Sequence, residues 1–498
     1  MGVISLLTMM LSAGYIPPRA HADCKYWVAP PPAGSDDNPG TASKPWATLE
    51  HAAEAIPDIS CTVWVNNGIF QGRNRISRRF ESTTKFKAVE PYKATFEADG
   101  MVLDINGAKN LWFEGFEFRH SGPGESPQVV KVDRAGEIWA ENITFHNNIF
   151  HDSYNDDLLK IHNGARFITV SNNLFYNQMA SEQHMDVNSV TDVFIYDNIF
   201  FNDFAGSGRE DPGDTKAFIV IKDSNQNDDG LLGSRRIQVR RNIFLNWQGG
   251  SLETIIQVGN DGNPTFEAQD VRVENNLFLG NSNEETGAVF GVKGARDVVF
   301  RNNTITGDLP CSTAYAFRIG VSGRNPKNQN IMFFNNIWSD PTGTMRVDTS
   351  GNECAFAYGK PENVINLILD NNLYWNGGKP IPDSNLVDPL ASDHSALVGD
   401  PLFQDSHQSL ILPRWQGNIF LSGMTTIRQE FLRLVSQYGQ VPSNSIVAGA
   451  SDPGNTPPDD ILGRKRDDMP EIGAFEIFQD TRQCYFIDLP AFMLFDCQ

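Results

Sequence analysis

A short pattern recurs eight times between residues 145 and 374. In each copy an apolar strand ends in two polar residues, the second is always Asn, and a bulky apolar residue stands two positions further on. The copies read FHNNIF (145–150), VSNNLF (170–175), IYDNIF (195–200), VRRNIF (239–244), VENNLF (273–278), FRNNTI (300–305), FFNNIW (333–338) and LDNNLY (369–374). The repeated Asn stands at 148, 173, 198, 242, 276, 303, 336 and 372, so the shortest interval is 25 residues. A fixed minimum period with occasional longer gaps is typical of a solenoid with loops inserted into some turns.

The residues around each Asn indicate what one turn of the solenoid looks like. Segments such as FITV (167–170) and VRV (271–273) alternate apolar and polar residues, as strands do. Asn tolerates left-handed backbone conformations and suits a tight bend between strands. Stacked bends would place Asn over Asn in an amide ladder, with the following aromatics stacked inside. A leucine-rich repeat would need Leu at fixed spacing with helical segments, and a propeller would need units of about 40 residues with four antiparallel strands. We therefore expect an all-β chain, a parallel β-helix.

Composition and the chain ends limit the classes of function. The formal charge of −21 disfavours nucleic acid as a partner, because a phosphate backbone needs a basic footprint. No apolar run is long enough to span a bilayer. Residues 1–22 read as a signal peptide that ends in a small-x-small site. Six cysteines beyond it suggest an oxidising compartment, extracellular or periplasmic, and proximity favours the pairs Cys24–Cys61, Cys311–Cys354 and Cys484–Cys497.

The chain divides into three regions after the signal peptide. Residues 23–105 hold a strand, a Pro/Gly/Asp-rich loop and a helix near 46–55 that can cover the open end of the solenoid. Residues 106–377 are the coils. Residues 378–498 are irregular, with one amphipathic helix near 425–435. We expect a monomer.

Both ends of the chain resemble a known group of proteins. The opening, YWVAP (26–30), GSDDNPGT (34–41) and KPWATL (44–49), and the close, DILGRKR (460–466) and PEIGAFE (470–476), are similar to secreted right-handed β-helix proteins of the pectate-lyase-like superfamily. The resemblance covers nearly the whole chain and implies the right-handed form of the fold. It also implies an extracellular protein acting on polysaccharide, although members include lyases, hydrolases, epimerases and binders.

The segment NDDLLKIHN (155–163) resembles the calcium-binding coil of pectate lyases, where an acidic cluster begins a strand. Asp156 and Asp157, with Asp186 from the next coil, are candidate Ca²⁺ ligands, since hard cations take several oxygen ligands. The match is partial, because pectate lyases carry a further carboxylate where this chain has Lys160.

A row of outward-facing polar residues is expected along the strands that precede the bends. Coils stack about 4.8 Å apart, so these residues should form one ladder on one face. The ladder is rich in cations although the protein is acidic. With apolar residues taken as inward, its members are Lys160, His162, His184, Asp186, Lys222, Gln257, Lys293 and Arg318. An inserted loop at 202–211 is expected to wall this face and to contribute Arg209.

Such a ladder suits β-elimination on a uronic-acid polymer. The reaction needs a cation beside the carboxylate, a base to remove the adjacent proton, and an acid for the leaving oxygen. Gln257, Lys293 and Arg318 are expected to bind substrate. A lysine base needs a lowered pKa, which neighbouring cations provide. The expected catalytic residues are Lys160, His162, His184, Arg209 and Lys222.

Other functions stay open at this point. A glycoside hydrolase would use two carboxyl groups, which Asp157 and Asp186 on adjacent coils could supply, but the sequence lacks the Gly-His-Gly and Arg-Ile-Lys motifs of polygalacturonases. A non-catalytic carbohydrate-binding protein and an epimerase also fit a β-helix, because fold does not fix function. Lysines and arginines exposed on a solenoid often serve only solubility.

Overall fold

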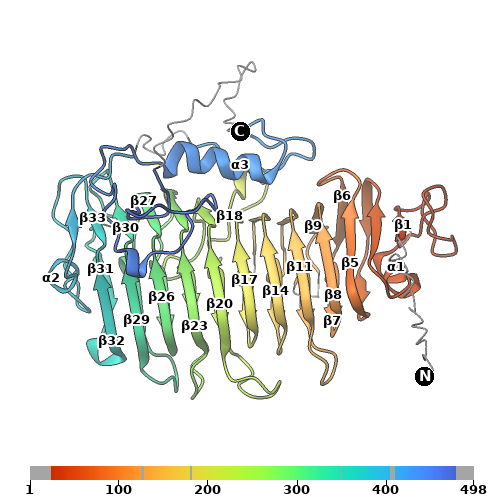
Figure 1. Ribbon diagram of the computed structural model, residues 1–498, viewed down its shortest axis with the longest axis horizontal. Coiled ribbons are helices and arrows are strands. Elements are labelled where there is room, and N and C mark those ends of the chain that lie inside the picture. The colour runs from red at the N-terminus through yellow and green to blue at the C-terminus, as the bar shows by residue number, and fades with distance from the viewer. Residues whose placement is uncertain (1–23, 125–127, 180–181, 348, 404–409, 478–498) are drawn as a thin grey trace, which may run out of the picture.

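The chain winds into a solenoid with three long parallel sheets (Figure 1). The computed structural model describes residues 24–124, 128–179, 182–347, 349–403 and 410–477. The sheets have 12, 10 and 12 strands, and each strand pairs in parallel with the equivalent strand of the next coil. The parallel β-helix expected from the repeat, and from the resemblance to the pectate-lyase-like superfamily, is confirmed. The expected signal peptide, 1–22, lies outside the described residues.

The three sheets are named A, B and C. Sheet A contains β1 (Cys24–Val28), β2 (Cys61–Val65), β5 (Arg79–Ala88), β8 (Lys109–Glu114), β11 (Glu141–His146), β14 (Arg166–Ser171), β17 (Thr191–Tyr196), β20 (Ser234–Arg240), β23 (Ala268–Glu274), β26 (Ala295–Arg301), β29 (Asn328–Phe334) and β32 (Val364–Asp370). Sheet B contains β4 (Asn74–Ile76), β7 (Leu103–Asn106), β10 (Val130–Asp133), β13 (Leu159–His162), β16 (Gln183–Asn188), β19 (Ala217–Lys222), β22 (Thr254–Val258), β25 (Ala288–Lys293), β28 (Ala314–Gly320) and β31 (Ala355–Gly359). Sheet C contains β3 (Gly68–Gln71), β6 (Ala94–Ala98), β9 (Phe116–His120), β12 (Ile149–His151), β15 (Leu174–Tyr176), β18 (Ile199–Phe201), β21 (Ile243–Leu245), β24 (Leu277–Asn281), β27 (Thr304–Asp308), β30 (Ile337–Ser339), β33 (Leu373–Trp375) and β34 (Leu397–Val398). The helical segments are α1 (Leu49–Ala55), α2 (Pro389–Ser392), α3 (Ile427–Leu434), the 3₁₀ turns η1 (Ala205–Ser207), η2 (Pro361–Asn363) and η4 (Pro453–Asn455), and the π turn η3 (Val435–Gly439).

The repeated Asn forms the amide ladder that the sequence predicts. Asn173 Nδ2 donates to Asn198 Oδ1 at 3.0 Å, and Asn198 Nδ2 donates to Asn242 Oδ1 at 3.0 Å. Each of these oxygens also accepts the backbone N–H of the preceding Asn. The left-handed backbone conformation expected for the ladder Asn is found instead at the residue before it, the first of the polar pair. In one copy this residue is Arg241, with a φ of 55°. The ladder ends where Asn372 Nδ2 donates to Asp393 Oδ2 at 2.7 Å.

The aromatic residue after each bend points into the solenoid, as expected. Phe150, Phe175, Phe200, Phe244 and Phe278 stack ring over ring, with centroids 4.7–5.1 Å apart. These side chains are buried together with the inward residues of all three sheets in one continuous core. Each coil therefore buries its inner face against its neighbours.

The N-terminal end of the solenoid is covered by α1 (Figure 1). Thr48 caps this helix, and its Leu49, Ala52 and Ala53 join the core. The disulfides Cys24–Cys61 and Cys311–Cys354 are present as expected. The third expected pair, Cys484–Cys497, lies outside the described residues.

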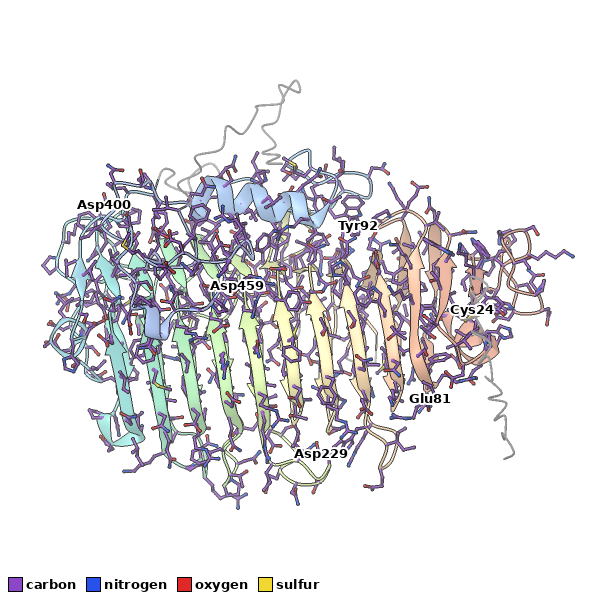
Figure 2. The ribbon with its side chains drawn as sticks, in the orientation of Figure 1. Cys24, Glu81, Tyr92, Asp229, Asp400 and Asp459 are labelled. Atoms are coloured by element: carbon purple, nitrogen blue, oxygen red, sulfur yellow. A yellow bond between two sulfur atoms is a disulfide. The ribbon has the colours of Figure 1, made fainter. Side chains whose placement is uncertain are left out.

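The C-terminal segment returns along the solenoid, and α3 lies over the outer face of sheet C (Figure 1). A capping box formed by Thr426 and Gln429 begins the helix, close to where the amphipathic pattern predicts it. Its apolar face, including Phe431, packs on outward residues of sheet C such as Leu277. Asp459, labelled in Figure 2, contacts sheet A by accepting from Arg240 at 2.5 Å. None of the helices in the described part of the chain combines the length and apolar character that crossing a bilayer requires.

Candidate functional site

The polar residues expected on one face lie on the outer face of sheet B, in two adjacent rows rather than one. Strand register places one row at Lys131, Lys160, Asp186, Val220, Gln257, Gly291, Arg318 and Tyr358. The second row contains His162, Asn188 and Lys222, and further along Lys293 beside Gly320. Seven of the eight predicted ladder residues belong to these rows, and His184 does not.

The first part of this face is an ion cluster around Lys160. The Nζ of Lys160 lies 2.8 Å from Asp186 Oδ2 and 3.2 Å from Asp157 Oδ2, and the Nζ of Lys222 lies 3.8 Å from Asp186 Oδ2. Both carboxylates have no exposed surface, and Lys160 retains 19 %. The two ammonium groups therefore neutralise two buried carboxylates that belong to adjacent coils.

This pairing contradicts the expected lysine base. Burial acts to lower the pKa of Lys160, but the charges of Asp157 and Asp186 outweigh it and raise that pKa above its ordinary value. The pKa of Lys222 is raised in the same way, because Asp186 and Asp261 outweigh burial. Lys160 and Lys222 are thus held protonated, the opposite of what a proton acceptor needs.

His162 lies beside the ion cluster and pairs with a carboxylate of the previous coil. Its Nε2 is 3.2 Å from Asp133 Oδ2. Burial opposes ionisation of Asp133, but the hydrogen bond and charge of His162 outweigh it and lower the pKa of Asp133. His162 therefore serves as the partner of Asp133.

The second part of the face contains a cationic pair, Lys293 and Arg318, that has Glu253 nearby but no described carboxylate within 4 Å. Neither Lys293 nor Arg318 makes an ion pair with any described residue, and the Nζ of Lys293 has only Asn260 Oδ1 at 3.4 Å as a polar contact. Burial, assisted by the Arg318 cation, lowers the pKa of Lys293, and burial likewise lowers the pKa of Arg318. Both side chains are half-buried and so remain in contact with solvent.

Two glycines lie next to this pair, Gly320 with open space above it and Gly291 covered by the Gln257 side chain. Gly320 pairs with Lys293, and a side chain there would meet no atom within 4 Å. Gly291 pairs with Arg318, and a Cβ on it would lie 2.1 Å from Gln257 Oε1. Tyr358, the next residue in the row, is 49 % exposed. The arrangement places two cations, the open space above Gly320 and an exposed aromatic ring on the same face.

Gln257 is locked rather than free to bind substrate as expected. Its Oε1 accepts from Thr254 Oγ1 at 3.0 Å and its Nε2 donates to the Gly259 carbonyl at 2.6 Å. Only 6 % of the residue is exposed. Gln257 therefore shapes the surface beside Arg318.

The expected catalytic position of His184 is wrong. His184 is fully buried, its ring centroid lies 4.6 Å from that of the tilted Phe218 ring, and its Nε2 is hydrogen-bonded to Asn202 Oδ1 at 2.9 Å. Burial lowers the pKa of His184 to about 3. It lies near the start of β16, where strict alternation of inward and outward residues fails.

Arg209 also lies apart from the two rows. Its Nη1 is 2.8 Å from Asp152 Oδ1 and its Nη2 donates to the Ser153 carbonyl at 2.8 Å, while its guanidinium covers the Tyr154 ring at 4.1 Å. Only 6 % of the side chain is exposed. Arg209 connects its loop to the turn between β12 and β13. Its side chain is too buried to contact a substrate, which argues against the catalytic role expected for it.

The carboxylates expected to hold calcium separate into two groups. Asp156 and Asp157 have ligand atoms within 4.8 Å of each other and of Glu182, which the sequence pattern did not reveal. Asp186 is instead paired with Lys160 and Lys222. Asp156 Oδ2 accepts from Gln128 at 3.0 Å, so this oxygen is already in use. Three carboxylates fit a cation in charge, but calcium takes six to eight oxygen ligands.

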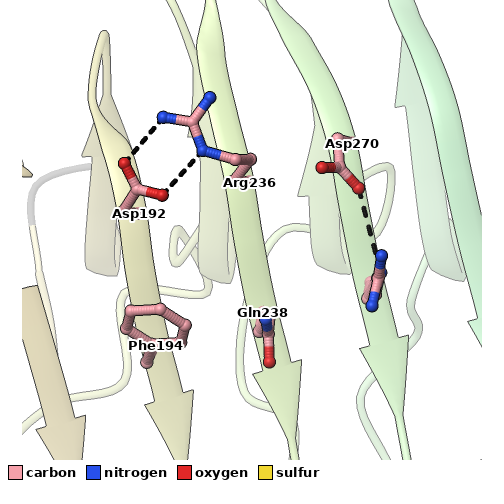
Figure 3. A pocket seen from close by; sticks show the side chains of 6 residues that line it. Asp192, Phe194, Arg236, Gln238 and Asp270 are labelled. Carbon is pink, nitrogen blue, oxygen red and sulfur yellow. Dashed lines mark hydrogen bonds and ion pairs between the residues drawn. The ribbon is translucent and has the colours of Figure 1, made fainter. Parts of the chain in front are cut away.

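A hollow of about 180 Å³ lies on the outer face of sheet A (Figure 3). Its charged lining is internally paired: Arg236 Nε lies 2.6 Å from Asp192 Oδ1, and Arg272 Nε lies 3.8 Å from Asp270 Oδ1. Phe194 and Gln238, on adjacent strands, also line it. With its charges satisfied, this hollow offers less to an acidic ligand than Lys293 and Arg318 do.

No family model and no curated protein matches the sequence. Among solved structures, the chain is similar to XylC in complex with xylose, with 10 % identity, a TM-score of 0.47 and coverage of 91 % of this chain and 98 % of that one. The chain is also similar to pectate lyase Pel9A, with 14 % identity, a TM-score of 0.46 and coverage of 91 % of this chain and 96 % of that one. For GH136 lacto-N-biosidase from Eubacterium ramulus the identity is 11 %, the TM-score 0.49, and the coverage 76 % of this chain and 67 % of that one. The fold assignment rests on this chain's own strand order and Asn ladder.

Proposed function

We propose that the protein is a secreted polysaccharide lyase that cleaves a uronic-acid-containing polymer by β-elimination, at Lys293 and Arg318. The observation that carries the proposal is a solvent-accessible cationic pair that makes no ion pair within 4 Å with a described carboxylate, although Glu253 is nearby, in a protein with a net charge of −21. Two cations left unpaired at such a charge suit an anionic ligand. The two disulfides support an oxidising compartment.

Each step of the elimination has a group on this face. Arg318 would bind the uronate carboxylate, which makes the proton on the adjacent carbon removable. Lys293, neutral in the reactive state, would take that proton. The electron pair then forms the carbon–carbon double bond as the bond to the leaving oxygen breaks, and the leaving oxygen takes a proton from solvent. Tyr358, exposed beside Arg318, suits stacking against a sugar ring.

Calcium is not part of this proposed step. Asp156, Asp157 and Glu182 are the described residues that would hold the ion, where it would supply a positive charge beside the Lys160 cluster. The carboxylate of the substrate is neutralised by Arg318 instead. Elimination in the presence of a chelator is therefore expected.

A glycoside hydrolase is the second candidate, because two neighbouring carboxyl groups differ in acidity. Burial raises the pKa of Asp157 well above its ordinary value, whereas the charges of Lys160 and Lys222 outweigh burial and lower the pKa of Asp186. Such a divergence is what an acid and base pair needs. Both side chains, however, are completely buried beneath Lys160 and cannot reach a glycosidic oxygen.

The experiment incubates the full-length protein with polygalacturonate, alginate and glycosaminoglycans, with and without chelator. A new ultraviolet absorbance of unsaturated ends indicates elimination. New reducing ends without that absorbance would show hydrolysis and contradict the lyase proposal. A changed uronate stereochemistry in the NMR spectrum without cleavage would indicate an epimerase, and binding without any change would indicate a carbohydrate-binding protein.

A further inference from the structure

A second polar hollow, of about 330 Å³, lies on a different sheet from the cationic pair. Its floor is the outer face of sheet C, where Arg119, His151 and Tyr176 stand side by side on β9, β12 and β15. Its rim is the C-terminal segment at 414–417 together with Ser207 of η1. Two of its lining residues, Tyr176 and Trp415, also belong to the apolar cluster under α3, and its volume falls in the range of small-molecule sites.

Two polar groups in the lining, the Trp415 Nε1 and the Tyr176 hydroxyl, make no hydrogen bond with a described residue. Tyr176 is 2 % exposed, and within the described residues its hydroxyl makes no hydrogen bond. Its ring is fixed between His151 and Phe201, with centroids 4.7 and 4.9 Å away. Burial, with the charges of Asp152 and Glu117, raises the pKa of Tyr176 well above its ordinary value. The phenol is therefore a rigid hydrogen-bond donor at the wall of the hollow. The buried Trp415 N–H is costly unless a ligand or water satisfies it.

The charges that line the hollow cancel. His151 lies between two carboxylates, with Nε2 2.9 Å from Glu117 Oε1 and Nδ1 2.8 Å from Asp152 Oδ2. Arg119 lies 2.8 Å from Glu97 Oε2, outside the hollow.

The rim cation is neutralised in the same way. Arg414 Nε lies 2.8 Å from Asp203 Oδ2. A strongly charged ligand would displace these pairings. A neutral ligand with many hydroxyl groups can use the carboxylate oxygens as acceptors and the guanidinium and phenol groups as donors while the pairs remain intact.

We propose that this hollow on sheet C binds a neutral sugar residue, with the Tyr176 hydroxyl, Arg119 and Asp152 as its polar contacts and Trp415 and Gln416 at its wall and rim. The site is separate from Lys293 and Arg318, and it does not depend on the reaction proposed there. It would hold a neutral part of a glycan on a second face of the solenoid.

The test titrates the full-length protein with the methyl glycosides of glucose, galactose, mannose and xylose and with methyl galacturonide, followed by saturation-transfer difference NMR. We expect saturable binding of at least one neutral glycoside. Tyr176→Phe removes only the unpartnered hydroxyl and should weaken that binding about three- to tenfold, as one hydrogen bond is worth. Gln416→Trp, on the exposed rim, should block it by bulk. Far-UV circular dichroism verifies that both variants fold.

Tyr196→Phe is the matched control, since it makes the same change on the half-buried outer face of sheet A, in neither proposed site, and should leave binding of the neutral glycoside unaltered. The proposal is overturned if no neutral glycoside saturates, if Tyr176→Phe binds as tightly as the wild type, or if methyl galacturonide alone binds. The NMR binding measurement does not depend on lyase activity, so each proposal can be refuted without affecting the other.

Discussion

Replacing Asn242 by alanine tests the amide ladder at its middle. Asn242 is fully buried, its Oδ1 accepts from the backbone N–H and from Nδ2 of Asn198 at 3.0 Å, and its Nδ2 donates to Asn276 Oδ1 at 3.0 Å. The variant leaves the buried Asn198 N–H without an acceptor, which costs about 2 kcal/mol, and removes the two ladder bonds with Asn198 Nδ2 and Asn276 Oδ1, worth about 1 kcal/mol each. It also removes the bonds that Nδ2 donates to the Ile195 and Arg240 carbonyls. The expected local destabilisation is therefore at least about 4 kcal/mol.

Native-state hydrogen exchange of the Asn198 amide measures this loss directly. Denaturant midpoints are less suitable, because a long solenoid need not unfold in one step. A loss of about 2 kcal/mol at the orphaned N–H alone predicts a protection factor lower by roughly 30-fold. The control is Asn67→Ala, an exposed amide with a single bond to Glu90 at 2.6 Å, for which the change should stay within about 0.5 kcal/mol. Protection of Asn198 within threefold of the wild type would refute the ladder as a source of stability.

Three further predictions concern other parts of the molecule. The pKa of His151 is raised to about 9 because the charges and hydrogen bonds of Asp152 and Glu117 outweigh burial. Protonated His151 thus stabilises the protein by up to about 3 kcal/mol below pH about 6.5, and this stabilisation disappears as the pH rises through about 9. The Tm of the wild type should therefore fall over that pH range, and the fall should be absent in His151→Gln. His184→Ala should destabilise the protein by roughly 2–4 kcal/mol by leaving a cavity beside Phe218, and should not change activity per folded molecule; a specific loss of turnover would restore a catalytic role. Gly291→Ala should push aside the Gln257 amide, for which we expect a loss of about 1–3 kcal/mol and weaker substrate binding; a variant with unchanged Tm and KM would contradict the close contact.

The fold was predictable because the repeat states its own period. Each of the eight copies carries an Asn at the bend and a bulky apolar residue two positions later, aromatic in all but Ile305, so the spacing alone specifies the ladder and the stack. Which residue of the bend takes the left-handed conformation was harder to predict. Arg241 in a left-handed conformation shows that the position before the ladder Asn is selected by the bend and not by residue type.

The candidate site was predictable in part. Period-two alternation placed Lys160, Lys222, Lys293 and Arg318 on one sheet correctly, but it failed for His184, because the start of β16 faces inward at a position that strict alternation assigns outward. The protonation of the lysines could not be foreseen, since it depends on which carboxylates the neighbouring coils bring within 4 Å. The place where α3 packs depends on long-range contacts that a local pattern does not contain.

The most direct test of the proposed chemistry compares Lys293→Arg, Lys293→Met and Lys327→Met in the unsaturated-product assay on the active polymer. Arginine keeps the positive charge but cannot release its proton at working pH, so Lys293→Arg should bind polymer and lose turnover by at least about 100-fold. Lys293→Met should lose turnover equally. Lys327, exposed in the loop before β29, is the control and should keep full activity. Wild-type turnover in Lys293→Arg would contradict the assignment of Lys293 as the base.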